Sequence, residues 1–497
     1  MAKRKRKNVA LRLFTLLLWL ITLAGFGYCC YTLYNMDVIP EKYYYIAFIV
    51  VGFMLFTFFT FLIKRNTRRW IFIFNIIIFI LILGASTLIY FKFTSVVDFL
   101  NKNLSQHYET NVYYFLVNSE SKYTKLEEIE NETISLVNDI NDKESLEKNV
   151  QKKFKNPNIK VNYLDSILDA LYDVEVNPEL ILLANSGNYD AMVENFPEFE
   201  EKVRNLGTLE IQKRVENKET GIDMTQDAFV VYLSGIDTRS GTLPANSLSD
   251  VNILMAIDPI ERNILMVHIP RDYYVPLHGM NGSKDKLTHA GLVGGINMSK
   301  STVEDLFDID ILYYVRVNFN AAIKLVDAVG GITVYSDQKK TFKCWTDQAC
   351  KIKPGNNSVD GRCALAFARE RYTYKEGDRH RGENQEQVIR LLIEKITKSE
   401  TILLKSSDIL ESLNGTFESN ISTEEIMSLV KMQLNDMSGW NISTYNVSGT
   451  DGYGRTYSYP KQDLYVMIPD TSTIEKAKAE LNKILIDEKP EENDTGA

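Results

Sequence analysis

The sequence predicts an α/β protein with a layered α-β-α core domain outside the membrane, preceded by three transmembrane helices and a small α/β accessory domain. Three observations lead to this fold class. Apolar residues crowd the first hundred positions, strand-like and helical patterns alternate later, and charged residues stand at the ends of the strand-like runs. We divide the 497 residues into a membrane anchor (1–93), an accessory domain (94–225), a core domain (226–487) and an acidic tail expected to be disordered (488–497).

The anchor contains three apolar segments in a row, Leu13–Tyr34, Tyr43–Ile63 and Ile71–Phe91. Each is around twenty residues long and almost uncharged, the length that a helix needs to cross about 30 Å of hydrocarbon. A cleaved signal peptide or a buried soluble helix would not produce three such segments. We therefore expect a multi-pass protein of the cell membrane.

Basic residues give the anchor an orientation. They cluster before the first span (Lys3–Lys7) and between the second and third spans (Lys64–Arg69), and loops rich in Lys and Arg face the cytoplasm. The N-terminus is then cytoplasmic, and everything after about Phe93 is extracytoplasmic. ATP-dependent chemistry is not expected there. The net charge of -9 argues against nucleic acid as a partner, because a polyanion binder would be basic overall.

The accessory domain carries helical patterns and short strand-like runs. The helices are expected at Thr124–Asp139, Leu164–Tyr172 and Met192–Leu206, and the strands at Val112–Val117 and Leu209–Val215. No catalytic constellation stands out, and the Glu/Lys runs are typical of solvated helix faces. The domain is expected to position the core relative to the membrane or to offer a partner surface.

The chain has five cysteines, of which Cys29 and Cys30 lie in the first span. In an oxidising compartment we expect a disulfide between Cys344 and Cys350, with Cys363 as a small core residue. Metal binding by the last three is disfavoured, because no CxxC pair or histidine stands at zinc-site spacing.

The core domain begins with three short apolar runs that are typical of buried strands: Ala228–Ile236, Val251–Ile257 and Ile264–Ile269. The link between the last two, Asp258–Asn263, is short and rich in turn residues, so it predicts an antiparallel hairpin.

Charged residues lie at one end of these strands. The hairpin brings Asp250 and Arg271 together, because one precedes its first strand and the other follows its second. If the first run lies parallel to the third, Asp237 and Arg239 reach the same sheet edge. Sheets of α/β proteins bind ligands outside such strand ends.

The rest of the core alternates helices and strands. A helix is predicted at Ser301–Phe307 from its capping pattern, and another from Asp360 to Ala368. A third, from about Gly382, has an apolar stripe of Ile389, Leu392, Ile393 and Ile396. The other expected elements are strands Leu312–Val317, Ile332–Tyr335, Trp440–Val447 and Leu464–Ile468 and helices Ala321–Val329 and Thr473–Leu485.

Several arginines follow in the second half of the core. Arg369 and Arg371 would point the same way in an extended segment, and Arg381 and Gln385 share one face near a helix N-terminus, which favours anions. The planar guanidinium suits bidentate contact with phosphate. The alternative is a set of surface ion pairs with acidic neighbours such as Glu370.

Two carboxylates beside these arginines, Asp237 and Asp250, predict a site for Mg²⁺, which prefers one or two carboxylates together with substrate phosphates and water. The alternative for Asp237 is an Asx-turn. The histidines form no HExxH motif, and the GLVGG segment (291–295) lacks the Lys-Ser/Thr of a phosphate-binding loop.

The pieces GIDTRSG, SDVNILMAIDP, HIPRDYYV, KLTHAGLVGG, NFNAAIKLVDAVGGITV, ALAFARERY and GDRHRGENQ, in this order, resemble the LytR-CpsA-Psr (LCP) family of Gram-positive cell-wall enzymes. The resemblance runs from about Phe229 to Ile396. Glu386, where many members carry glutamine, and the loop of Cys344 and Cys350 depart from the family pattern.

The resemblance implies an LCP-like core with phosphotransferase activity. Such an enzyme moves a glycopolymer (teichoic acid, capsule or a related glycan) from an undecaprenyl-pyrophosphate carrier in the membrane to peptidoglycan. It implies that Asp237 and Asp250 hold Mg²⁺ and that the pyrophosphate is bound by Arg239, Arg271, Arg369, Arg371, Arg381 and Gln385. The aspartates with Arg271, Arg369 and Arg371 would form the catalytic set. Two other functions stay open, a non-catalytic binder of polyprenyl-linked glycans and a hydrolase.

Overall fold

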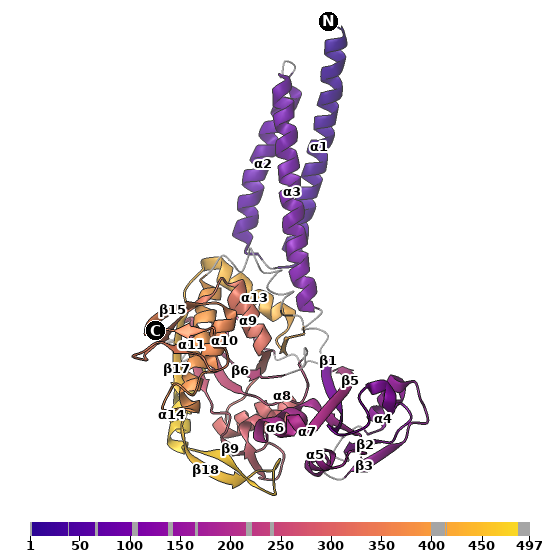
Figure 1. Ribbon diagram of the computed structural model, residues 1–497. Helices are drawn as coiled ribbons and strands as arrows, with labels where there is room; N and C mark the ends of the chain where they lie inside the picture. Colours follow the sequence, from indigo (N-terminus) through magenta and orange to yellow (C-terminus); the bar gives the residue numbers. More distant parts are fainter. Residues whose placement is uncertain are drawn as a thin grey trace, which may run out of the picture.

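The computed structural model describes residues 2–485 except 38, 65–67, 102–107, 138–142, 165–166, 215–220, 239–242, 399–412 and 414. The expected acidic tail therefore lies outside the described residues. In Figure 1 the long N-terminal helices stand together above the rest of the chain, which is built around a five-stranded and a six-stranded sheet.

The three helices are α1 (Ala2–Asn35), α2 (Glu41–Ile63) and α3 (Arg69–Leu100). All three are long and apolar enough to cross a membrane, which agrees with the three predicted spans. The C-terminal end of α3 packs Val96 against Met427 of α13 (Thr423–Asp436). The core therefore rests directly on the end of the anchor.

The first sheet lies in the part of the chain that we call the accessory region (residues 108–214). Its strand order is β3-β2-β4-β1-β5. The strands are β1 (Tyr108–Asn118), β2 (Ile134–Val137), β3 (Val161–Leu164), β4 (Leu182–Asn185) and β5 (Val203–Arg214). The helices are η2 (Leu126–Ile129), α4 (Lys143–Phe154), α5 (Ile167–Val176), α6 (Ser186–Asn195) and α7 (Phe199–Lys202).

Two helix predictions in this region were wrong. Within the described part of 124–139 the chain forms only the short η2 and the strand β2, in which Ile134 and Leu136 alternate into the core as strand residues do. Within 192–206 the single predicted helix is broken: α6 ends at Asn195, two residues before Pro197, the short α7 follows, and β5 begins at Val203. The helix predicted at 164–172 is α5, shifted toward the C-terminus.

The second sheet has six strands in the order β16-β11-β6-β7-β8-β17. They are β6 (Phe229–Ile236), β7 (Val251–Asp258), β8 (Asn263–His268), β11 (Tyr313–Asn318), β16 (Phe417–Ser419) and β17 (Asn441–Asn446). β7 is antiparallel to both β6 and β8. The predicted hairpin and the shared direction of the first and third runs are therefore confirmed.

Helices cover both faces of this sheet. On one face, α8 (Leu287–Phe307) and α14 (Thr471–Leu485) bury residues such as Phe307 and Ile474 against it. On the other face, α11 (Asp378–Thr397) packs Ile389 and Ile393 against the sheet beside α13. The layered α-β-α core that the alternating patterns predicted is therefore present.

The remaining elements surround these layers. They are α9 (Phe319–Ala328), α10 (Gly361–Ala368), β9 (Tyr274–Pro276), β10 (Lys284–Lys286), β12 (Ile332–Ser336), β13 (Phe342–Lys343), β14 (Lys351–Ile352), β15 (Gly355–Val359), β18 (Gly449–Arg455) and β19 (Asp463–Pro469). Asp360 caps α10 as predicted, by accepting a hydrogen bond from the backbone N–H of Cys363. α8 and α11 begin earlier than expected, at Leu287 and Asp378.

The predicted disulfide was wrong in its partner. Cys350 is bonded to Cys363, and Cys344 is a buried free thiol. The first turn of α10 brings Cys363 against Cys350, while Cys344 packs in an apolar cluster with Val334 and Phe367. Sequence proximity favoured the wrong pair, because the helix that supplies the true partner comes later in the chain.

The accessory region is docked tightly on the core. The hairpin of β18 and β19 inserts Tyr459 into the apolar cluster of Tyr189 and Phe199. A Cβ added to Gly187 of α6 would lie 2.6 Å from the backbone oxygen of Asn246 in the core. Such close approach fixes α6 beside the loop that leads into β7.

Candidate active site

A cavity of about 240 Å³ lies outside the ends of β6, β7 and β8. It is lined by Asp190, Val193, Glu194, Asp237, Leu248, Asp250, Arg271, Phe319, Trp345, Thr346, Arg369, Arg371, Arg381 and Gln385. Every site residue predicted from the sequence lies on this lining except Arg239, which lies outside the described residues. The structure therefore brings together groups that come from separate parts of the core.

Asp250 and Arg271 form the innermost pair. The Nη1 of Arg271 donates to Oδ1 of Asp250 at 2.7 Å, and their side chains are only 14% and 11% exposed. Burial by itself would raise the pKa of Asp250, but the charges of Arg271, Arg381 and Arg369 outweigh it and hold that pKa below its ordinary value. The carboxylate is therefore ionised at neutral pH.

Backbone hydrogen bonds hold this pair in place. The N–H of Asp250 donates to the carbonyl of Gly235 at 2.8 Å, and the N–H of Thr288 donates to the carbonyl of Arg271 at 2.9 Å. Thr288 is in the first turn of α8, and its own carbonyl accepts from Ser249 at 3.3 Å. The start of α8 therefore fixes the loops that carry both charged residues.

Asp237 pairs with Arg369 across the cavity entrance. The Nη2 of Arg369 donates to Oδ2 of Asp237 at 2.7 Å, and its guanidinium lies 4.8 Å from the ring centre of Phe319 at the start of α9. The expected extended conformation at Arg369 was wrong, because Arg369 ends α10 by donating its N–H to the carbonyl of Leu365. Arg371 still reaches the same cavity.

Arg381 and Gln385 face the cavity from the first turns of α11, as their spacing predicted. Arg381 pairs with Asp378 at 2.8 Å. Burial and the neighbouring charge of Arg271 lower the pKa of Arg381. Two buried guanidinium groups are thus held close together at an electrostatic cost, which an anionic ligand would relieve.

His268, the last residue of β8, packs its ring against the N-terminal part of α11. Burial lowers its pKa to about 4, the charge of Arg381 contributes in the same direction, and a hydrogen bond with Gln385 opposes it. The imidazole is therefore neutral at pH 7. A Cβ on Gly382 would lie 2.3 Å from Cε1 of this ring, so only glycine allows the helix to approach so closely.

Glu386 and Glu370 lie outside the cavity lining. Burial raises the pKa of Glu386, and hydrogen bonds from Thr444 and Asn446 of β17 oppose this. Glu386, which stands where many family members carry glutamine, thus contacts β17 and not the cavity. Glu370 is only 1% exposed and accepts backbone N–H groups, including that of Trp345. It therefore does not act as the surface ion-pair partner considered for the arginines.

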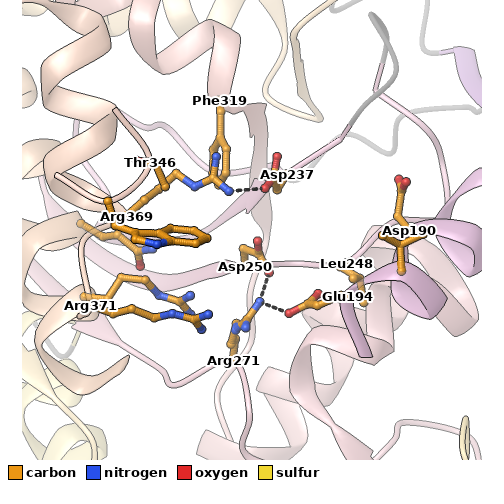
Figure 2. A pocket seen from close by; sticks show the side chains of 14 residues that line it. Asp190, Glu194, Asp237, Leu248, Asp250, Arg271, Phe319, Thr346, Arg369 and Arg371 are labelled. Atoms are coloured by element: carbon orange, nitrogen blue, oxygen red, sulfur yellow. Dashed lines mark hydrogen bonds and ion pairs between the residues drawn. The ribbon is translucent and has the colours of Figure 1, made fainter. Parts of the chain in front are cut away.

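Two acidic residues of the accessory region complete the cavity. Asp190 and Glu194 of α6 enter from the side opposite Arg369 and Arg371 (Figure 2). Oε1 of Glu194 lies 2.7 Å from Nη1 of Arg271. Sequence reasoning missed them, because the helix was predicted to begin only at Met192 and the charged residues of this region were interpreted as solvated helix faces.

The donor set fits a magnesium ion that shares its coordination with a ligand. No group of three or more His, Cys, Asp or Glu side chains with metal-binding geometry occurs in the described part of the chain. Asp237 and Asp250 both line the cavity, and one carboxylate oxygen of each takes an arginine. Mg²⁺ is bound in proteins by one or two carboxylates plus phosphate and water, which these two aspartates can supply in part.

The charges of the lining balance. Four arginines face four carboxylates, those of Asp190, Glu194, Asp237 and Asp250. A pyrophosphate would add negative charge to this set. Its binding would therefore be favoured by a divalent cation on the carboxylates or by release of Glu194 from Arg271.

Fold and site together define a membrane-anchored α/β protein with an arginine-rich cavity suited to a phosphorylated ligand. The LytR_cpsA_psr family description matches residues 199–483, which is more than half of the chain. The chain therefore belongs to the LytR_cpsA_psr family. The match begins in the accessory region and extends beyond the segment of the quoted motifs at both ends.

Several relatives are named as teichoic acid transferases. The polyisoprenyl-teichoic acid–peptidoglycan teichoic acid transferase TagU of Oceanobacillus iheyensis is 32% identical over 237 residues, covering 46% of this chain and 69% of the relative. The corresponding TagT of Bacillus subtilis is 33% identical over 224 residues, covering 44% and 66%. The matched segment thus spans about two thirds of these relatives.

Solved structures with similar folds include TagT bound to LIIa-WTA, which is 26% identical, with 54% of this chain and 95% of that chain covered and a TM-score of 0.44. The crystal structure of B. subtilis TagV is 29% identical, with 52% and 98% covered and a TM-score of 0.44.

Proposed function

We propose that this protein transfers a glycopolymer from an undecaprenyl-pyrophosphate carrier to peptidoglycan on the outer side of the cell membrane. The observation that carries the proposal is the convergence of four arginines and two core aspartates in one cavity at the sheet edge. Relatives with the matching core are named for this transfer. The basic loops of the anchor support an extracytoplasmic core.

In the proposed reaction, a hydroxyl oxygen of peptidoglycan attacks the phosphorus that carries the glycan. The bond between this phosphorus and the bridging oxygen breaks, polyprenyl phosphate leaves, and the hydroxyl proton is released. Negative charge builds on the phosphate oxygens and on the leaving group. Arg271 and Arg381, both largely buried, are placed to stabilise this charge, because fixed cations act most strongly where water is excluded.

Asp237 and Asp250 would hold Mg²⁺, which would neutralise phosphate charge when bound. Arg369 and Arg371 lie at the more open side and would orient the pyrophosphate. Gln385 offers an amide donor beside Arg381 and is itself held by His268. Arg239 is included among the proposed phosphate-binding residues because it lies in the GIDTRSG motif that resembles the family.

The test is a transfer assay on the full-length protein in detergent or nanodiscs, with a lipid-linked glycan, a peptidoglycan acceptor and Mg²⁺. Arg371→Ala and Asp250→Ala should each lower transfer at least 100-fold, since fixed charges at such sites contribute about 10²–10³ in rate. Arg379→Ala is the matched control, because Arg379 is on α11 but pairs with the exposed Asp451 outside the cavity.

Release of polyprenyl phosphate and covalent attachment of glycan are measured in parallel. Release without attachment in the presence of acceptor would identify a hydrolase, and binding without release would identify a carrier of lipid-linked glycans. Normal transfer by both Arg371→Ala and Asp250→Ala would overturn the proposal. Transfer that persists fully in EDTA would overturn the role of Mg²⁺.

A further inference from the structure

An exposed aromatic pair lies at the edge of the cavity. Trp345 lines the cavity itself, and its ring centre is 4.9 Å from that of Tyr372. The two residues are 60% and 59% exposed. Aromatic side chains with this much solvent exposure do not gain the stabilisation that burial provides. Contiguous exposed apolar surface often marks a binding site.

One buried carboxylate fixes the backbone under both rings. Oε2 of Glu370 accepts the N–H of Trp345 at 2.6 Å, and Oε1 accepts the N–H of Tyr372 at 2.9 Å and that of Thr373 at 3.1 Å. Glu370 stands between Arg369 and Arg371 in the chain. The same residue therefore links the aromatic pair to the cavity arginines.

The loop of Trp345 is also held at its other end. Cys344 donates its N–H to the carbonyl of Cys350 at 3.0 Å, and Cys350 is bonded to Cys363 in α10. Asp347 pairs with Arg362 of α10 at 2.6 Å. The rings are thus positioned before any ligand arrives, which reduces the entropy lost on binding.

Arg371 connects the pair to the proposed phosphate site. Its guanidinium lies 4.8 Å from the ring centre of Tyr372, and Nη2 donates to the Tyr372 hydroxyl at 2.8 Å. Figure 2 shows Arg371 and Thr346 on the same side of the cavity, away from Asp190. A group attached directly to a phosphate held by Arg371 would therefore reach the aromatic pair.

We propose that Trp345 and Tyr372, whose ring planes are tilted by 53°, form an angled platform on which the pyranose ring that is joined to the pyrophosphate of the donor stacks against Trp345 and borders Tyr372. The proposal rests on the proposed function and extends it to the sugar side of the substrate. A pyranose presents C–H groups on its face and hydroxyl groups around its rim. Aromatic rings with polar edges suit the face, and the hydroxyl of Thr346 suits the rim.

A polyprenyl chain fits this surface less well. It exposes only hydrocarbon and is stabilised by removal from water, whereas both rings here face solvent and are flanked by Arg371 and Thr346. The lipid and the sugar leave the pyrophosphate from opposite ends. A platform beside Arg371 that takes the sugar leaves the other side of the cavity for the lipid.

The test measures binding of two probes to the full-length protein in detergent with Mg²⁺. One probe is farnesyl pyrophosphate, and the other is farnesyl pyrophosphate whose terminal phosphate carries N-acetylglucosamine. Trp345→Ala should weaken binding of the sugar-bearing probe about tenfold, the scale of one stacked ring, and leave farnesyl pyrophosphate within about twofold. Trp345→Phe should retain most of the affinity, and Tyr453→Ala, which removes an exposed aromatic outside the cavity, should change neither probe.

Fluorescence gives a second readout that a structural role would not move. The chain has four tryptophans, and the signal of Trp345 is isolated by subtracting the spectrum of Trp345→Ala. This signal should shift with the sugar-bearing probe and stay constant with farnesyl pyrophosphate. Equal weakening of both probes by Trp345→Ala would assign the platform to lipid or phosphate and overturn the proposal, as would no weakening. If the wild type binds neither probe, the proposed function fails as well.

Discussion

Replacing Gly382 by alanine should destabilise the protein, although the same change inside an ordinary helix is favourable. Alanine in place of a helical glycine gains about 1 kcal/mol. Here the added methyl group would lie 2.3, 2.7 and 2.8 Å from three atoms of the buried His268 ring. Overpacking of this kind costs about 1–3 kcal/mol, and contacts this short belong at the upper end. The expected net loss is therefore about 2 kcal/mol, or roughly 4–8 °C in melting temperature for a unit of 150–250 residues.

The same substitution should impair transfer. His268 is hydrogen-bonded to Gln385 and lies close to the charge of Arg381, so displacement of its ring moves the face of α11 that lines the cavity. We expect kcat/KM to fall about tenfold or more, as positional errors near 1 Å cost up to about 100-fold.

A double-mutant cycle with His268→Ala tests the cause. Thermal melts and transfer rates are measured for both single variants and the double variant in the same detergent. If the clash is with the imidazole, Gly382→Ala should cost much less when that ring is absent. A melting temperature equal to or above that of the wild type, or an equal loss in both backgrounds, would refute the reasoning.

Three further predictions concern stability and covalent structure. Burial raises the pKa of Glu386 above its ordinary 4.5. The protonated side chain therefore stabilises the fold at low pH, and this stabilisation is lost as the pH rises through the pKa that Glu386 has in the folded protein. Glu386→Gln should accordingly raise the melting temperature at pH 7 but not at pH 4. The pKa of His268 is lowered from 6.5 to about 4, so unfolding should become easier as the pH falls through this window, by about 3 kcal/mol in total; an acid titration as steep in His268→Asn as in the wild type would contradict this. Non-reducing peptide mapping should recover Cys350 joined to Cys363, with Cys344 alkylated only after unfolding; a Cys344–Cys350 peptide would contradict it.

The sequence could predict the part of the site that local chain geometry determines. The link between β7 and β8 is too short for anything but a hairpin, so the positions of Asp250 and Arg271 followed from the strand boundaries alone. The spacing of Arg381 and Gln385 likewise followed from helical periodicity. In both cases the interacting residues belong to one hairpin or one helix, and the geometry of such a unit is nearly fixed by its type and length.

The rest depended on how separate units dock. Glu194 reaches Arg271 only because α6 approaches the core through Gly187, and neither residue carries a pattern that reveals this. Trp345 owes its place at the cavity to Glu370, whose sequence context suggested a surface ion pair. A glutamate that is buried by a distant segment accepts backbone hydrogen bonds instead of forming a surface ion pair, and the local charge pattern does not reveal this burial.

The position of α6 bears on how members of this family could be recombined. The arginines and the core aspartates, including the Asp250 that pairs with Arg271, belong to the core, whereas Glu194, the second acid at Arg271, comes from the accessory region. A chimera in which residues 108–214 are exchanged would keep the cavity arginines and the core aspartates but lose the wall of the cavity that Asp190 and Glu194 form. Exchange of the accessory region would therefore change the charge beside Arg271 even when every core residue stays the same.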